Sequence, residues 1–281
     1  MATKKAASTN KKAPVKASTS STAKTTVKTV KTVSVSASAS QTGLSSHIVT
    51  SLRSAKLWRA LAAEFIGTFL LAAVIIAGQG QPIFVLFALV GIVLLIGAIS
   101  GSHVNPAITI GAWATRRIGW LRAVGYILAQ FLGAAVAYVV FNAFIGGAGA
   151  VSEQQQLYGQ TAPTLFAAVD VANIAGKEWY IFFSELLGTA ILGFAVASAT
   201  RTIDRLTGAF TIGLGIFAAL MITVTVAGYV SGSAIINPAA ALALQAYVPS
   251  VWAYVVYALA PVLGGVFGFI VHDLVRTKEV I

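Results

Sequence analysis

The tripeptide Asn-Pro-Ala occurs twice in this chain, at 105–107 and at 237–239, and each copy follows a Ser-Gly-Ser turn in an apolar half of the sequence. Asparagine is a strong helix N-cap and proline is favoured at the first helical position, so each copy predicts a helix start. The apolar residues after each start are too few to cross a bilayer, which takes about 20. The pattern predicts two half-helices, near 105–115 and 237–247, that begin inside a membrane and line a pore. The pore-forming residues would be Asn105, Pro106, Ala107, Asn237, Pro238 and Ala239.

Six longer apolar stretches surround these two motifs. Apolar residues make up 57% of the chain and the mean hydropathy is +0.85, far above the range of soluble domains. Each stretch is long enough to cross a bilayer as a helix, which predicts an all-α, multi-pass membrane protein. Because the chain contains no cysteine, disulfides and thiol chemistry are excluded. The predicted spans are 57–78, 83–100, 120–145, 178–199, 208–230 and 251–272.

The basic charge of the chain is concentrated before the first span. Residues 1–56 hold ten of the nineteen Lys and Arg residues and no acid, so the net charge of +11 belongs mainly to this segment. Its Lys/Ala/Ser/Thr composition predicts disorder. Two interpretations remain open, a polybasic arm on anionic lipid and a solvated tail. A nucleic-acid partner is not expected. The channel domain would occupy 57–275, and 276–281 would form a short terminus.

The distribution of Lys and Arg predicts the orientation in the membrane. Eighteen of these nineteen residues fall on one side of the six predicted spans, and Lys177 alone falls on the other. Basic residues accumulate on the cytoplasmic side. Both termini are therefore expected in the cytoplasm, in a plasma membrane or a bacterial inner membrane.

An internal repeat divides the channel domain into two halves, about 57–145 and 178–272. The block Glu-x-x-Gly-Thr opens the first half at Glu64 and the second half at Glu185. Each half then holds three spans and one Asn-Pro-Ala motif. Three is an odd number, so the second half must be inverted relative to the first. The two half-helices would enter from opposite sides and meet near the midplane.

The meeting point predicts a path for neutral solutes. Each Asn oxygen can cap its own half-helix, which leaves the amide NH2 groups of Asn105 and Asn237 to donate hydrogen bonds into the space between them. The two helix N-termini add partial positive charge at the same place. A water molecule would be oriented there, and a cation would be repelled.

These motifs resemble those of the aquaporin, or major intrinsic protein, family, and the resemblance covers about 57–275. It implies six transmembrane helices with two re-entrant half-helices, assembled as a homotetramer with one pore per subunit. It places Glu64 and Glu185 behind the re-entrant loops as scaffold groups, whereas a proton relay would be their alternative role. It places His103 at the cytoplasmic pore mouth, either as a hydrogen-bonding wall residue or as a gate.

The resemblance also assigns a selectivity filter, in which this chain departs from the family pattern. Most relatives carry Arg directly after the second Asn-Pro-Ala, and here that position is Ala240. The other filter positions, matched by their spacing from the Asn residues, would be Val85, Thr225 and Ala234. The usual aromatic and histidine are absent from these positions, so the filter is expected to be wide, apolar and uncharged.

The sequence therefore predicts a passive channel for water, and for small uncharged solutes that pass an Arg-less filter. The alternative within this class is a facilitator of glycerol, urea or ammonia with little preference for water. Two alternatives from other classes are a secondary transporter and a non-conducting structural membrane protein. No enzymatic activity, cofactor or metal is expected.

Overall fold

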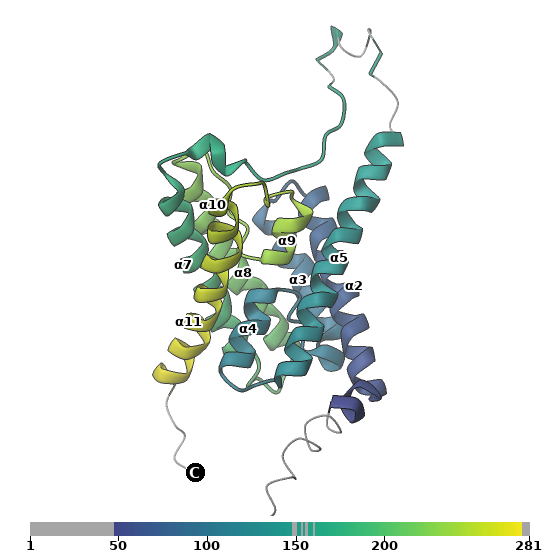
Figure 1. Cartoon of the computed structure of the whole chain (residues 1–281), viewed down its shortest axis with the longest axis vertical. Helices are drawn as coiled ribbons and strands as arrows, with labels where there is room; N and C mark the ends of the chain where they lie inside the picture. Colours follow the sequence, from purple (N-terminus) through teal and green to yellow (C-terminus); the bar gives the residue numbers. More distant parts are fainter. Residues whose placement is uncertain (1–47, 148–150, 153, 155–156, 160, 277–281) are drawn as a thin grey trace, which may run out of the picture. The chain divides into compact units, whose positions relative to one another are not determined.

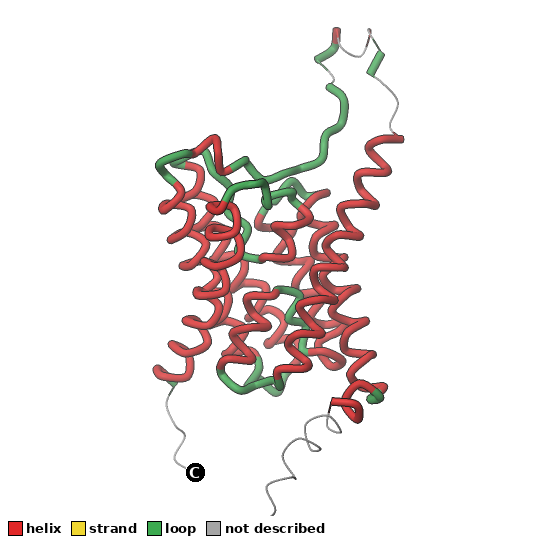
Figure 2. The backbone as a smooth tube through the Cα atoms, in the orientation of Figure 1, coloured by secondary structure: helices red, strands yellow, loops and turns green. Residues whose placement is uncertain are grey.

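The computed structural model describes residues 48–147, 151–152, 154, 157–159 and 161–276, and its backbone in these ranges forms helices joined by loops (Figures 1 and 2). Six helices there are long and apolar enough to cross a membrane. The predicted all-α membrane fold is confirmed. The spans are α2 (Ala55–Ala77), α3 (Pro82–Ser100), α5 (Trp120–Gly147), α7 (Glu178–Ala199), α8 (Arg205–Gly228) and a composite helix, Val251–Val275.

Two short helices, α4 (Pro106–Ala114) and α9 (Pro238–Ala243), begin at the two Asn-Pro-Ala motifs. They lie in opposite halves of the bundle, α4 low and α9 high in Figure 1. The second is shorter than predicted. It ends at Ala243 because Gln245 adopts a left-handed backbone (φ 57°) and its N–H returns to the Leu242 carbonyl. Neither helix is long enough to cross a bilayer.

The two halves of the bundle are interlocked. Within each half the first and third long helices pack together, α2 on α5 and α7 on α11 (Ala260–Val275). Each half-helix also packs on the third helix of the opposite half, α4 on α11 and α9 on α5. The guanidinium of Arg117, just after α4, binds both carboxylate oxygens of Asp273 at 2.8 and 3.2 Å, which fastens α4 to the end of α11.

The last span is composite because a proline interrupts its hydrogen bonding. It consists of α10 (Val251–Tyr254), the π-helical turn η2 (Val255–Leu259) and α11. Pro261 has no N–H to donate to the carbonyl of Tyr257, four residues earlier. The hydroxyl of Tyr247 lies 3.1 Å from that carbonyl and 3.0 Å from the carbonyl of Pro238. The same side chain therefore joins the interrupted span to the start of α9.

The N-terminal boundary differs from the prediction. Residues 48–52 are helical, and the indole Nε1 of Trp58 donates a 2.7 Å hydrogen bond to the carbonyl of Leu52. The expected disorder of 1–56 is therefore wrong for 48–56, where this bond ties the short helix to α2. The rest of that segment, and residues 277–281, lie outside the described residues.

The ends of the bundle differ in charge. The end at which α4 terminates carries Arg116, Arg117, Arg122, Arg201, Arg205 and Arg276. We call it the basic end. Lys177 precedes α7 at the opposite end, which we call the far end.

Candidate functional site

The two Asn-Pro-Ala motifs bind each other through their asparagines. Asn105 Oδ1 accepts a 2.9 Å bond from Ala107 N, and Asn105 Nδ2 donates a 2.9 Å bond to the Ile236 carbonyl. Asn237 Oδ1 accepts from Ala239 N at 3.0 Å and Ala240 N at 3.3 Å, and Asn237 Nδ2 donates to the Val104 carbonyl at 3.0 Å. Each asparagine therefore caps its own half-helix and bonds to the residue that precedes the other asparagine.

This geometry refines the predicted role of the amides. A side-chain amide has two N–H donors, and one donor of each asparagine is used in the bond between the motifs. The second N–H of each amide has no hydrogen-bond partner among the described residues. Asn105 and Asn237 are each 3% exposed, so a passing molecule would meet these donors in a confined space.

The residues before the two asparagines adopt an unusual backbone. Val104 has φ 40° and Ile236 has φ 52°, a left-handed conformation that β-branched residues rarely take. Such strain persists only where the surroundings impose it. Here it turns the carbonyls of Val104 and Ile236 toward the opposite asparagine.

Two buried carboxylates hold these strained segments. Glu64 accepts hydrogen bonds from the backbone N–H groups of His103 at 3.0 Å and Val104 at 2.7 Å. Glu185 accepts from the N–H groups of Ile235 and Ile236, the latter at 2.7 Å. Both side chains are fully buried. The arrangement matches the scaffold role, because each carboxylate satisfies two backbone donors that belong to no helix.

Glu64 has an additional side-chain partner. Gln130 Nε2, on α5, lies 2.8 Å from Glu64 Oε2 and 2.9 Å from Thr109 Oγ1. His103 Nδ1 lies 3.2 Å from the same threonine oxygen, and its ring contacts Tyr126 edge-on at 5.3 Å. His103 is half-buried in this network. Its position fits a hydrogen-bonding wall residue.

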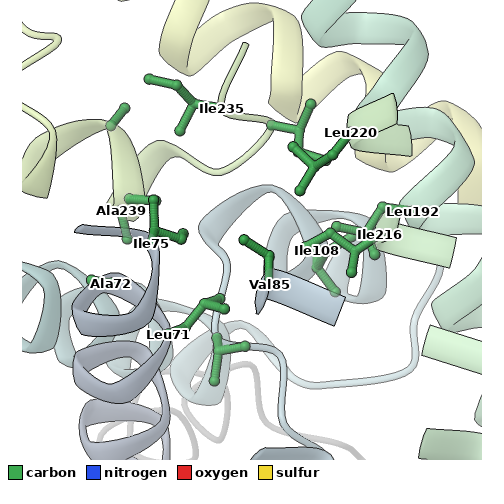
Figure 3. Close-up of a cluster of buried hydrophobic side chains, with 14 of the residues drawn as sticks. Leu71, Ala72, Ile75, Val85, Ile108, Leu192, Ile216, Leu220, Ile235 and Ala239 are labelled. Atoms are coloured by element: carbon green, nitrogen blue, oxygen red, sulfur yellow. The ribbon is translucent and has the colours of Figure 1, made fainter. Parts of the chain in front are cut away.

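A cavity of about 240 Å³ extends from the α2–α3 loop at the far end to Asn237. Its wall is mainly aliphatic, and Figure 3 shows Leu71, Ile75, Val85 and Leu220 in the buried cluster that contributes to it. Among the described residues, those that line this cavity include no charged side chain. Val85 and Ala234, two of the predicted filter residues, are part of the wall.

The structure places the other two predicted filter residues outside the wall. Thr225 is exposed and donates a 2.7 Å bond to the Met221 carbonyl of its own helix. The wall is formed by Ile216, Leu220 and Val224, which repeat every four residues on one face of α8, and Thr225 lies off that face. Val224, one residue earlier, takes the place in the wall that the spacing gave to Thr225. Ala240 is 1% exposed, and Leu244, one turn later on the chain, reaches the cavity instead.

Phe166 is a wall residue that the sequence did not suggest. It comes from the long segment between α5 and α7. Ala168 N in this segment donates a 2.9 Å hydrogen bond to the carbonyl of Leu244, the residue that follows α9. A Cβ on Gly80 would lie 2.7 Å from the Phe166 ring, so glycine makes room for it. An aromatic side chain is therefore present at the far end, but from a loop whose packing has no sequence signature.

Comparisons with known proteins bear on the family and the fold of this chain. The family model described as Major intrinsic protein matches residues 51–272. Aquaporin NIP1-1 of Zea mays is 31% identical over 192 residues, 67% of this chain and 60% of that relative. Aquaporin NIP3-1 of Zea mays is 30% identical over 240 residues, 79% of this chain and 72% of that relative. The X-ray structure of the aquaglyceroporin from Plasmodium falciparum superposes with a TM-score of 0.60 at 22% identity, covering 78% of this chain and 96% of that one, and shows a shared fold.

Proposed function

This chain belongs to the major intrinsic protein family of non-enzymatic channels for water or small solutes, and from that premise we propose that it conducts water together with small uncharged solutes. The observation that carries the proposal is the pair of cross-bonded asparagines, each with one remaining N–H, of which Asn237 lines the inner end of an uncharged cavity. A neutral molecule can accept from these donors in turn. A cation finds donors where it needs acceptors.

The wall beyond the asparagines supports the inclusion of solutes larger than water. Ala240 is buried outside the wall, and Leu244 and other aliphatic side chains face the cavity, so the cavity offers neither the charge nor the bulk of an arginine. The carbon atoms of a small solute form no hydrogen bonds with water, so they can contact this aliphatic wall without a loss of hydrogen bonding. Glycerol and urea are the probes we choose for this size class.

The experiment is stopped-flow light scattering on proteoliposomes under gradients of an impermeant osmolyte, glycerol or urea. Under the impermeant osmolyte we expect the vesicles to shrink faster than empty vesicles do. Under glycerol or urea we expect the solute to enter faster than it enters empty vesicles. Water flow equal to that of empty vesicles would contradict the channel for water. Solute entry equal to that of empty vesicles would contradict the wide filter.

Ala240→Arg tests whether position 240 controls the cavity. We expect it to reduce glycerol and urea entry at least about tenfold, the effect of 1.4 kcal/mol on a barrier. Any proton leak should fall as well, because the side chain introduces bulk and positive charge. Ala240→Met is the matched control, since it adds similar length without charge. Unchanged solute entry and leak in both variants would show that position 240 lies away from the constriction.

We also propose a homotetramer with one pore per subunit and an integral location in a plasma or bacterial inner membrane. Membership of the family supports both proposals. The six helices among the described residues that are long and apolar enough to cross a membrane support the integral location. Mass measurement of the detergent-solubilised protein tests the tetramer. A monomeric mass would contradict it.

A further inference from the structure

We propose that an anionic phospholipid binds to the outside of this protein at the basic end, with its headgroup between residues 48–56 and the start of α5 and one acyl chain along the α2–α5 groove. The site is separate from the pore cavity. It rests on two adjoining cavities with complementary chemistry, a polar basic one and a long apolar one.

The headgroup cavity measures about 350 Å³ and combines cations with hydroxyl groups. Lys56 and Arg122 line it from opposite elements, α2 and α5, together with Ser51 and Ser54. No acid is among the described residues that line it. A phosphate group needs such a set of donors and positive charges.

Arg122 is held in place by its neighbours. Its Nε donates a 2.7 Å bond to the Tyr126 hydroxyl, and its Nη2 lies 3.4 Å from the Ser100 carbonyl. The guanidinium also stacks over the Tyr126 ring at 5.1 Å. These contacts fix the side chain, while its Nη1 makes no hydrogen bond to another described residue. A fixed arginine with a donor to spare loses little entropy on binding an anion.

The acyl-chain groove adjoins this cavity directly. It measures about 540 Å³, and Leu57 and Leu121 line both spaces. Leu57, Leu61 and Phe65 repeat every four residues along α2, so the groove runs lengthwise along a membrane-spanning helix. Small residues, Ala62, Gly125 and Ala129, keep it open.

The basic cavity lies at one end of the apolar groove, and this arrangement favours a lipid as the occupant. The charges lie at one end of the groove only, where α2 and α5 begin, and the wall beyond them is apolar along the membrane-crossing direction. Trp58 and Trp120 line the two spaces at that same end, and tryptophan is enriched at the boundary between headgroups and hydrocarbon. A phospholipid has this sequence of chemistry, anion first and hydrocarbon after.

The chain contains no cysteine, which makes a site-specific probe straightforward. Ala62 is exposed and lines the groove, so Ala62→Cys in the full chain carries a single fluorophore there. The labelled protein is reconstituted in mixtures of unbrominated lipid with brominated phosphatidylglycerol or brominated phosphatidylcholine. We expect stronger quenching by the anionic lipid at equal mole fraction, with a binding preference of roughly fivefold for each contributing cation.

Lys56→Gln in the same background should lower that preference about fivefold. Arg59→Gln is the matched control, because Arg59 is exposed on the same helix three residues later and does not line either space. Arg122→Gln should lower the preference as well. The proposal is overturned if the two lipids quench equally, or if Lys56→Gln and Arg59→Gln have the same effect. It is also overturned if neither lipid quenches the label, as would occur if a second copy of the chain or residues 1–47 covered the groove.

The outcome does not depend on the solute that the pore conducts. Water permeability of the same vesicles, measured in parallel, separates the two proposals. A variant that loses lipid preference and keeps water flow supports an external lipid site.

Discussion

At the scale of single residues, the central device is a pair of strained backbone positions held by two carboxylates. Val104 and Ile236 are left-handed, and Glu64 and Glu185 bind their N–H groups. A carboxylate is suited to this task because both of its oxygens accept. An amide of the same shape has one accepting oxygen, and its NH2 would face a backbone donor.

Glu185→Gln should therefore destabilise the protein by about 3 kcal/mol, the cost of losing charge-assisted bonds and leaving a buried donor unpaired. Thermal unfolding of the detergent-solubilised protein measures the change, and water permeability should fall with it. Glu178→Gln makes the same chemical change at the start of α7, outside the re-entrant loops, and serves as the control. Equal unfolding temperatures for the two variants would contradict the scaffold role of Glu185.

The sequence predicted these residues with uneven success, for a physical reason. The two asparagines can be predicted because the preferences for Asn at a helix N-cap and for Pro at the next position depend on only a few neighbouring residues. The carboxylates stand out because charge is costly inside an apolar span. Val224 was missed in favour of Thr225, because spacing from a motif does not fix the rotation of α8 to within one residue. Phe166 was missed because its loop is positioned by tertiary contacts alone.

At the scale of elements, the repeated Glu-x-x-Gly-Thr block joins a long helix to a re-entrant loop. Its glutamate binds the loop backbone, and its glycine makes room for the strained residue. A Cβ on Gly67 would lie 2.7 Å from Val104 Cγ1, and one on Gly188 would lie 2.8 Å from Ile236 Cγ2. The sequence shows the repeat of these glycines, but only the packing shows what each one faces.

Gly188→Ala is expected to cost about 1–3 kcal/mol through overpacking, because the new methyl would also lie 2.3 Å from Thr223 Cγ2. Gly91→Ala is the matched control. A Cβ there meets nothing within 4 Å, so the substitution should raise stability by up to about 1 kcal/mol through helix propensity. Thermal unfolding compares the two. A neutral Gly188→Ala would mean that α7 can move away from the loop.

At the scale of the whole molecule, charge separates the two ends of the bundle. Arginines surround the basic end, and Lys177 lies at the far end. We expect the basic end, with both termini, to face the cytoplasm. The six spans could be predicted from hydropathy, and the inversion of the second half could be predicted because each repeat holds an odd number of spans. The interlocking of the halves was not, since packing partners leave no periodic signal.

The orientation is tested by adding one thiol at a time to the cysteine-free chain. Lys177→Cys should react with a membrane-impermeant maleimide in intact cells, whereas Arg201→Cys should react only after the membrane is opened. Both positions are exposed, so accessibility to water is matched. The reverse pattern would contradict the assignment.

The exchange of half-helices between the two halves has a consequence for how the chain is made. The helix α4 packs on α11, which is synthesised last among the described helices. During translation the first Asn-Pro-Ala motif is therefore inserted long before its packing partner exists. Until α11 is made, α4 can pack only on α5 and then on α7, and both motifs are enclosed only when the final span arrives.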